Sequence, residues 1–241
     1  MLTALLAATL VAVPPPAPAL QVASEKIGGS TTLVGGEEGP RLWAAIKGLR
    51  GMAGAETAAG LAAQALAGAS AKGLERAISA ASAKVFSEAT RTPALKGMGA
   101  TLVAAAQEGG RLTIAHVGDC RAWRLRGGKL EQLTEDHSLL NDYLKTRKLT
   151  PEEIAAFPYK NVVVRAVGVK SEVQADVRQE QLAPGDRYLL ATAELQSALD
   201  PERIGKLLGE AEPAKALAAA AQKLGVTELA LLVLTVPEAK K

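Results

Sequence analysis

The fold is decided by residues 97–139, which read GMGATLVAAAQEGGRLTIAHVGDCRAWRLRGGKLEQLTEDHSL. Short β-rich runs alternate in this stretch with glycine pairs or with the dipeptide Gly118-Asp119. Tight chain reversals favour glycine because it adopts positive φ angles without steric cost. The stretch therefore predicts an antiparallel meander, with strands at 98–106, 111–117, 121–126 and 129–133.

The composition favours one large domain over two small ones. Hydrophobic residues make up 48% of the 241 residues but aromatic residues only 3%, and no change in composition divides the chain. The net charge is +3, without a long basic run or aromatic residues among the basic ones, which argues against a nucleic-acid partner. Cys120 is the single cysteine, which excludes an intrachain disulfide and a multi-thiolate metal site.

Residues 1–19 form an apolar and proline-rich segment ahead of the domain. The run at 2–13 is too short to span a bilayer but has the length of a signal-peptide core, and small residues follow at 17–19. No Lys or Arg precedes the run, so export and a cytoplasmic location both remain open, as does membrane association. We assign the domain to residues 20–237 and a short tail to 238–241.

The rest of the chain predicts helices on both sides of further strands. Leu74, Ile78, Ala81 and Val85 form one apolar stripe of a helix. A short helix is expected after Thr150, which is a good N-cap followed by proline and two acids. The expected helices cover residues 53–71, 72–89, 139–148 and 213–224. The expected further strands cover residues 20–24, 42–46, 162–167, 174–181, 187–191 and 229–236.

Several motifs resemble those of the PPM-type, or type 2C, metal-dependent protein serine/threonine phosphatases, particularly the compact bacterial ones. They occur in the family's order over roughly residues 20–236, at Gly97–Thr101, Ala115–Arg121, Thr134–Leu139, Leu149–Glu153, Asn161–Gly168 and Leu182–Leu190. The resemblance implies an α+β fold, the PPM-type four-layer α-β-β-α sandwich of two antiparallel sheets flanked by helices.

The chain departs from this family where the metal ligands are expected. PPM-type enzymes hold two divalent ions that activate a water for attack on phosphorus. The degenerate catalytic positions in this chain are Lys47, Gly48, Met52, Ala193 and Thr227. Lys47, Ala193 and Thr227 match acidic positions of the family, and Met52 matches its general-acid histidine. The turn Gly28-Gly29-Ser30 replaces a phosphate-holding arginine and an acidic run, and we expect it only to connect two strands.

Lys47 is the most consequential of these differences. An ammonium about 4 Å from a divalent ion repels it by roughly 8 kcal/mol at an effective dielectric constant of about 20. We therefore expect Lys47 to exclude a metal ion and to form an ion pair with Glu194 or Glu228 instead.

One acid of the family, Asp119, is retained. In some relatives its equivalent helps to bind an additional metal, but Asp119 can also cap its own turn by hydrogen bonds to the backbone. His116 and His137 are expected to be buried or turn residues rather than metal ligands.

These observations favour a pseudophosphatase-like binding or regulatory module that lacks the two-metal catalytic centre. In this hypothesis the protein is not an enzyme, needs no metal cofactor and binds a protein partner, such as a phosphoprotein or a kinase-pathway component. The alternative is an active metal-dependent protein serine/threonine phosphatase with a rearranged or single-metal site that uses Asp119 and Glu228 with manganese or magnesium. An exported structural or scaffold domain is a third hypothesis.

Overall fold

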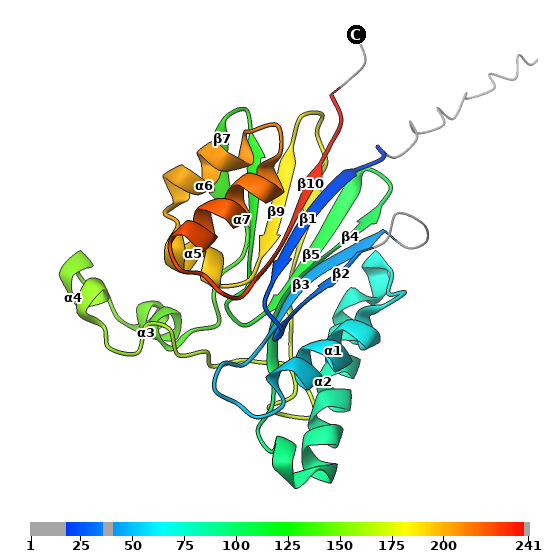
Figure 1. Ribbon diagram of the computed structural model, residues 1–241, viewed down its shortest axis with the longest axis vertical. Coiled ribbons are helices and arrows are strands. Elements are labelled where there is room, and N and C mark those ends of the chain that lie inside the picture. Colours follow the sequence, from blue (N-terminus) through cyan, green and yellow to red (C-terminus); the bar gives the residue numbers. More distant parts are fainter. Residues whose placement is uncertain (1–17, 36–40, 239–241) are drawn as a thin grey trace, which may run out of the picture.

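Two five-stranded antiparallel sheets pack face to face in the computed structural model, which describes residues 18–35 and 41–238 (Figure 1). The first sheet contains, in order, β1 (Gln21–Ile27), β10 (Leu229–Thr235), β9 (Arg187–Ala191), β6 (Arg121–Arg126) and β7 (Lys129–Gln132). The second sheet contains β2 (Thr31–Val34), β3 (Leu42–Gly48), β4 (Ala100–Glu108), β5 (Arg111–Val117) and β8 (Asp176–Gln181). The expected sandwich of two antiparallel sheets is confirmed.

Helices cover the outer face of each sheet (Figure 1). The second sheet is covered by α1 (Ala55–Leu66) and α2 (Leu74–Arg91). The first sheet is covered by α5 (Glu194–Ala198), α6 (Pro201–Leu208) and α7 (Pro213–Lys223). The apolar stripe expected in residues 72–89 is confirmed, since Leu74, Ile78, Ala81 and Val85 are fully buried in α2.

Side chains of the inner strand β3 alternate between the two faces of the second sheet. Ala44 and Ile46 pack under the helices, whereas Trp43 and Ala45 pack between the sheets. Successive side chains of a strand point to opposite faces. Lys47, two residues after Ala45, therefore points into the space between the sheets, and it is only 5% exposed.

The meander of residues 97–139 is present, but it does not lie in one sheet. Glycine pairs close the β4–β5 and β6–β7 hairpins, while the turn at Gly118 carries the chain from the second sheet to the first. Gly118 has a φ of 96°, and a Cβ atom there would lie 2.2 Å from Cγ2 of Thr101. Only glycine fits this crossing between the sheets.

The excursion after β7 contains α3 (Leu139–Thr146) and α4 (Pro151–Ala156), which project away from the sandwich (Figure 1). The expected cap at Thr150 is confirmed, because Thr150 and Glu153 form a reciprocal capping box.

The expectation of a strand at residues 162–167 is wrong. Its run of valines is typical of a strand, but Val163 pairs singly with Ser138 and Val167 singly with Ala100. The segment thus makes single contacts with two different neighbours and does not continue the strand pairing of either sheet.

Most of the N-terminal segment assigned from the sequence lies outside the described residues, because the description begins at residue 18. Within the described part of the chain, no helix is both long enough and apolar enough to cross a membrane.

Replacing Gly118 by alanine should lower the free energy of unfolding by about 3 kcal/mol, because the new methyl group meets Thr101 and the left-handed backbone becomes strained. The matched control is Gly127→Ala, where φ is also positive but no atom lies within 4 Å of the added Cβ. The control should cost about 1 kcal/mol. Urea unfolding measures both values, and equal losses would contradict the steric role of Gly118.

Candidate active site between the sheets

Three charged residues from separate elements meet at one edge of the sandwich. Lys47 lies near the end of β3, Glu194 begins α5, and Glu228 directly precedes β10. The Lys47 ammonium donates a hydrogen bond to Oε1 of Glu194 and another, of 3.1 Å, to Oε2 of Glu228. The sequence predicts that Lys47 pairs with Glu194 or with Glu228, and in the structure it contacts both. We call this group the Lys47 pocket.

The turn between β1 and β2 supports the Lys47 pocket. Ser30 donates a 2.7 Å hydrogen bond from Oγ to the second carboxylate oxygen of Glu228. This bond and the bond from Lys47 hold the pKa of Glu228 below its usual value. Gly28 lets the turn lie close to Glu228, because a Cβ at this position would lie 2.7 Å from Cγ of Glu228. The expectation that this turn only connects two strands was wrong, because a contact to a residue so distant in the sequence leaves no local signal.

Glu194 carries an incompletely paired carboxylate. Its Oε2 atom is buried and has no hydrogen-bond partner in the described part of the chain. Arg50, whose side chain is 77% exposed, lies 3.6 Å from the other oxygen. Arg50 is therefore a solvent-exposed cation beside the Lys47 pocket.

The other degenerate positions have structural surroundings of their own. Gly48 is required by packing, since a Cβ would lie 2.1 Å from the carbonyl oxygen of Ala55. Met52 is 39% exposed and lies against Gly97. Ala193 is the N-cap residue of α5, and Thr227 is exposed next to Glu228. None of these side chains carries a carboxylate or an imidazole.

Asp119 lies on the turn that crosses between the sheets and is half-buried. Burial raises the pKa of its carboxyl group, and the charges of Asp136 and Glu194 raise it further, against a hydrogen bond from Thr101. Gln196 of α5 donates a 2.9 Å hydrogen bond to the Asp119 backbone carbonyl. The turn is thereby tied to the helix that carries Glu194.

A second group of titratable residues lies on the other side of this turn. His116 and His137 stack with 4.6 Å between their ring centroids, and Nε2 of His137 lies 3.3 Å from Oδ1 of Asp176. Each of the three offers one ligand atom, and these atoms lie within 4.8 Å of one another. Burial, with the nearby charges of His116 and Arg165, lowers the pKa of His137 to about 4. We call this group the histidine cluster.

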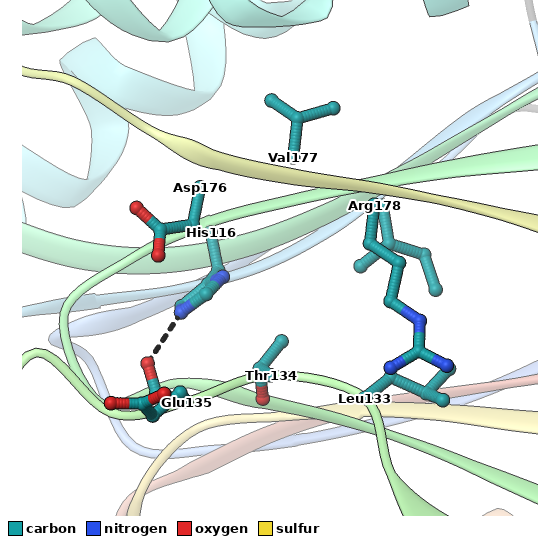
Figure 2. A pocket seen from close by; sticks show the side chains of 8 residues that line it. His116, Leu133, Thr134, Glu135, Asp176, Val177 and Arg178 are labelled. Carbon is teal, nitrogen blue, oxygen red and sulfur yellow. Dashed lines mark hydrogen bonds between the residues drawn. The ribbon is translucent and has the colours of Figure 1, made fainter.

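A cavity of about 200 Å³ opens beside the histidine cluster (Figure 2). Figure 2 shows His116 reaching the backbone carbonyl of Glu135, at 2.7 Å, with Asp176 next to it. The cavity is lined by Ile114, His116, Leu133, Thr134, Glu135, Asp176, Val177 and Arg178.

Two imidazoles and a carboxylate are a donor set that suits one divalent transition metal ion. His116 is arranged as a ligand, because a proton on Nε2 bonds to the Glu135 carbonyl, while Nδ1 has no hydrogen bond to any residue that the structure describes. His137 is not, since its Nδ1 accepts a 3.0 Å hydrogen bond from the Gly118 amide and its Nε2 carries the proton. Arg165 also lies 2.6 Å from Asp176, so an ion can bind only after this side chain moves and His137 changes its bonding.

A family model described as protein phosphatase 2C matches residues 54–142. Protein phosphatase PhpP of Streptococcus pneumoniae is 40% identical over 111 residues, which are 46% of this chain and 45% of PhpP. The serine/threonine protein phosphatase PstP of Mycobacterium tuberculosis is 33% identical over 69% of this chain and 34% of PstP. The PstP catalytic domain in complex with two manganese ions is 28% identical, with a TM-score of 0.79, over 91% of this chain and 99% of that domain.

The expected resemblance to the type 2C phosphatase family is thereby confirmed. The matched segment spans less than half the length of PhpP and of PstP.

Two expectations from the sequence are corrected by these findings. The pseudophosphatase hypothesis is wrong, because the relatives of this chain are named protein phosphatases. The expectation of no metal cofactor is also wrong, because a relative holds two manganese ions and this chain gathers a candidate metal cluster. Both errors came from judging metal binding only at the motif positions. Asp176 lies far from His116 and His137 in the sequence, and pairing of the edge strand β8 with β5 brings it next to them.

Replacing Asp119 by asparagine should stabilise the protein at neutral pH. A carboxyl group with a raised pKa in the folded state costs stability once it ionises, so the cost is absent below the pKa of the unfolded state and complete above that of the folded state. The gain from Asp119→Asn should therefore appear as the pH rises through the acidic range. Urea unfolding at pH 3.5 and pH 7, in EDTA, measures it. A larger gain at pH 3.5 than at pH 7 would refute this assignment, and exposed Asp142→Asn is the control.

Proposed function

We propose that this chain is a metal-dependent protein serine/threonine phosphatase with a rearranged metal site, and that its substrates are phosphoproteins. The likeness to the PstP catalytic domain over 91% of this chain carries the proposal, because that domain was solved with two manganese ions. The names of the curated relatives support the same reaction class.

The Lys47 pocket does not fit two divalent ions. The Lys47 ammonium already contacts both carboxylates, and a divalent ion about 4 Å away would be repelled by roughly 8 kcal/mol at an effective dielectric constant of about 20. Among the described residues, the histidine cluster is the group in which three ligand atoms converge. It adjoins the Asp119 turn through the bond from the Gly118 amide to His137. The ion of the proposed activity is therefore assigned to the Asp119 side of the site.

A divalent ion, when bound, supplies the positive charge that polarises a phosphoryl oxygen and activates a water. The residues of this chain would bind and orient the substrate. The exposed guanidinium of Arg50 can hold phosphoryl oxygens by paired hydrogen bonds. Asp119 has a raised pKa, which suits a group that accepts a proton near the reaction.

The test is an assay of the purified full chain with manganese or magnesium, on an aryl phosphate and on a phosphothreonine peptide. We expect metal-dependent turnover of both that EDTA abolishes. Turnover of the aryl phosphate alone would contradict the phosphoprotein substrate, and no turnover with either ion would overturn the proposal.

Isosteric variants locate the ion. Asp119→Asn and Asp176→Asn should each reduce kcat at least about tenfold, corresponding to roughly 1.4 kcal/mol. Asp142→Asn is the matched control, because Asp142 is exposed on α3 and should leave kcat unchanged. Full activity of both site variants would contradict the rearranged site.

A further inference from the structure

The Lys47 pocket joins the two sheets by charge. Lys47 belongs to β3 of the second sheet, while Glu194 follows β9 and Glu228 precedes β10, both in the first sheet. The side chain of Lys47 is 6% exposed and that of Glu194 is 12% exposed. The ammonium is therefore a buried bridge between carboxylates on the opposite sheet.

The carboxylates need a cation at this place. The side chain of Glu228 is 31% exposed, so Glu194 is the more deeply buried carboxylate. The two carboxylates flank one point, where they repel each other and lose part of their hydration. Lys47 supplies the nearest positive charge, and Arg50 adds a weaker one at 3.6 Å from Glu194. The remaining oxygen of Glu228 is bonded by Ser30. The pocket is thus nearly neutral with side chains of the protein alone.

We propose that Lys47 is the built-in cation of this pocket, holding the two sheets together at a place where carboxylates without it would bind a divalent metal ion. A divalent ion cannot join the pocket while the ammonium contacts both carboxylates. Removal of the ammonium leaves Glu194 and Glu228 as two oxygen donors, and a carboxylate at position 47 adds a third. Oxygen ligands of this kind are those that manganese and magnesium prefer. The inference concerns metal binding and stability, and it does not depend on the proposed phosphatase activity.

The experiment compares the full-length chain with Lys47→Asp, Lys47→Met and Lys215→Asp. The last is the matched control, because it makes the same charge change at a side chain that is 70% exposed. Every protein also carries Asp176→Asn, so that ions at the histidine cluster do not contribute. Isothermal titration with manganese gives the number of bound ions, and thermal unfolding in EDTA or excess manganese gives the stabilisation.

Lys47→Asp should bind one more manganese ion per chain than the Lys47 protein. It should also melt several degrees lower in EDTA and recover when manganese saturates the new site. Lys47→Met should show a smaller gain of the same kind, because two carboxylates remain, and it tests the inference if Lys47→Asp does not fold. The Lys47 protein and Lys215→Asp should melt at the same temperature in EDTA and in manganese.

Two results would overturn the inference. One is that neither Lys47 variant gains manganese binding or thermal recovery over the Lys47 protein. The other is that the Lys47 protein itself loses a manganese ion and several degrees of stability in EDTA. Neither result bears on turnover by the unmodified chain, so a failure here is distinct from a failure of the proposed function.

Discussion

A lysine ammonium can remain buried between two sheets only where carboxylates meet it. Lys47 reaches that place because alternation along β3 turns it to the same face as Trp43 and Ala45, which pack between the sheets. Its partners come from the opposite sheet. At this edge the relative position of the sheets therefore depends on charge pairing, whereas deeper in the sandwich it depends on apolar packing.

The surrounding chain is shaped to keep the partners in place. Gly28 lets the turn after β1 pass close to Glu228, and Ser30 then bonds the carboxylate oxygen that Lys47 does not use. Removing one partner of a buried pair costs more than the pair itself contributes, because the other charge is left uncompensated. Residues that look like replaced ligands in the sequence are thus parts of one connected electrostatic arrangement.

The sequence predicts the sandwich well because its signals are local. Glycine pairs specify the hairpins, and apolar periodicity specifies α2. It fails at 162–167, where a run of valines resembles a strand although no neighbouring strand continues alongside it. Local patterns report what a segment can form, and the available partners decide what it does form.

The candidate site is less predictable for the same reason. The opposite charges of Lys47, Glu194 and Glu228 predict that these residues pair. Alternation of side chains continued past the end of β9 would instead place Glu194 on the face that points away from Lys47. The contact exists because β9 ends at Ala191 and Glu194 begins a helix. Asp176 joins the histidines only through pairing of β5 with β8, which a single sequence does not reveal.

The Lys47 pocket and the histidine cluster are joined by the turn that crosses between the sheets. On one side the Gly118 amide bonds to His137, whose ring contacts Asp176. On the other, the Asp119 carbonyl accepts a bond from Gln196 on the helix that begins with Glu194. The two hydrogen bonds leave the turn at consecutive residues, Gly118 through its amide and Asp119 through its carbonyl. The same short turn thus contributes backbone hydrogen bonds to both groups, and the positions of the histidine cluster and of α5 both depend on it.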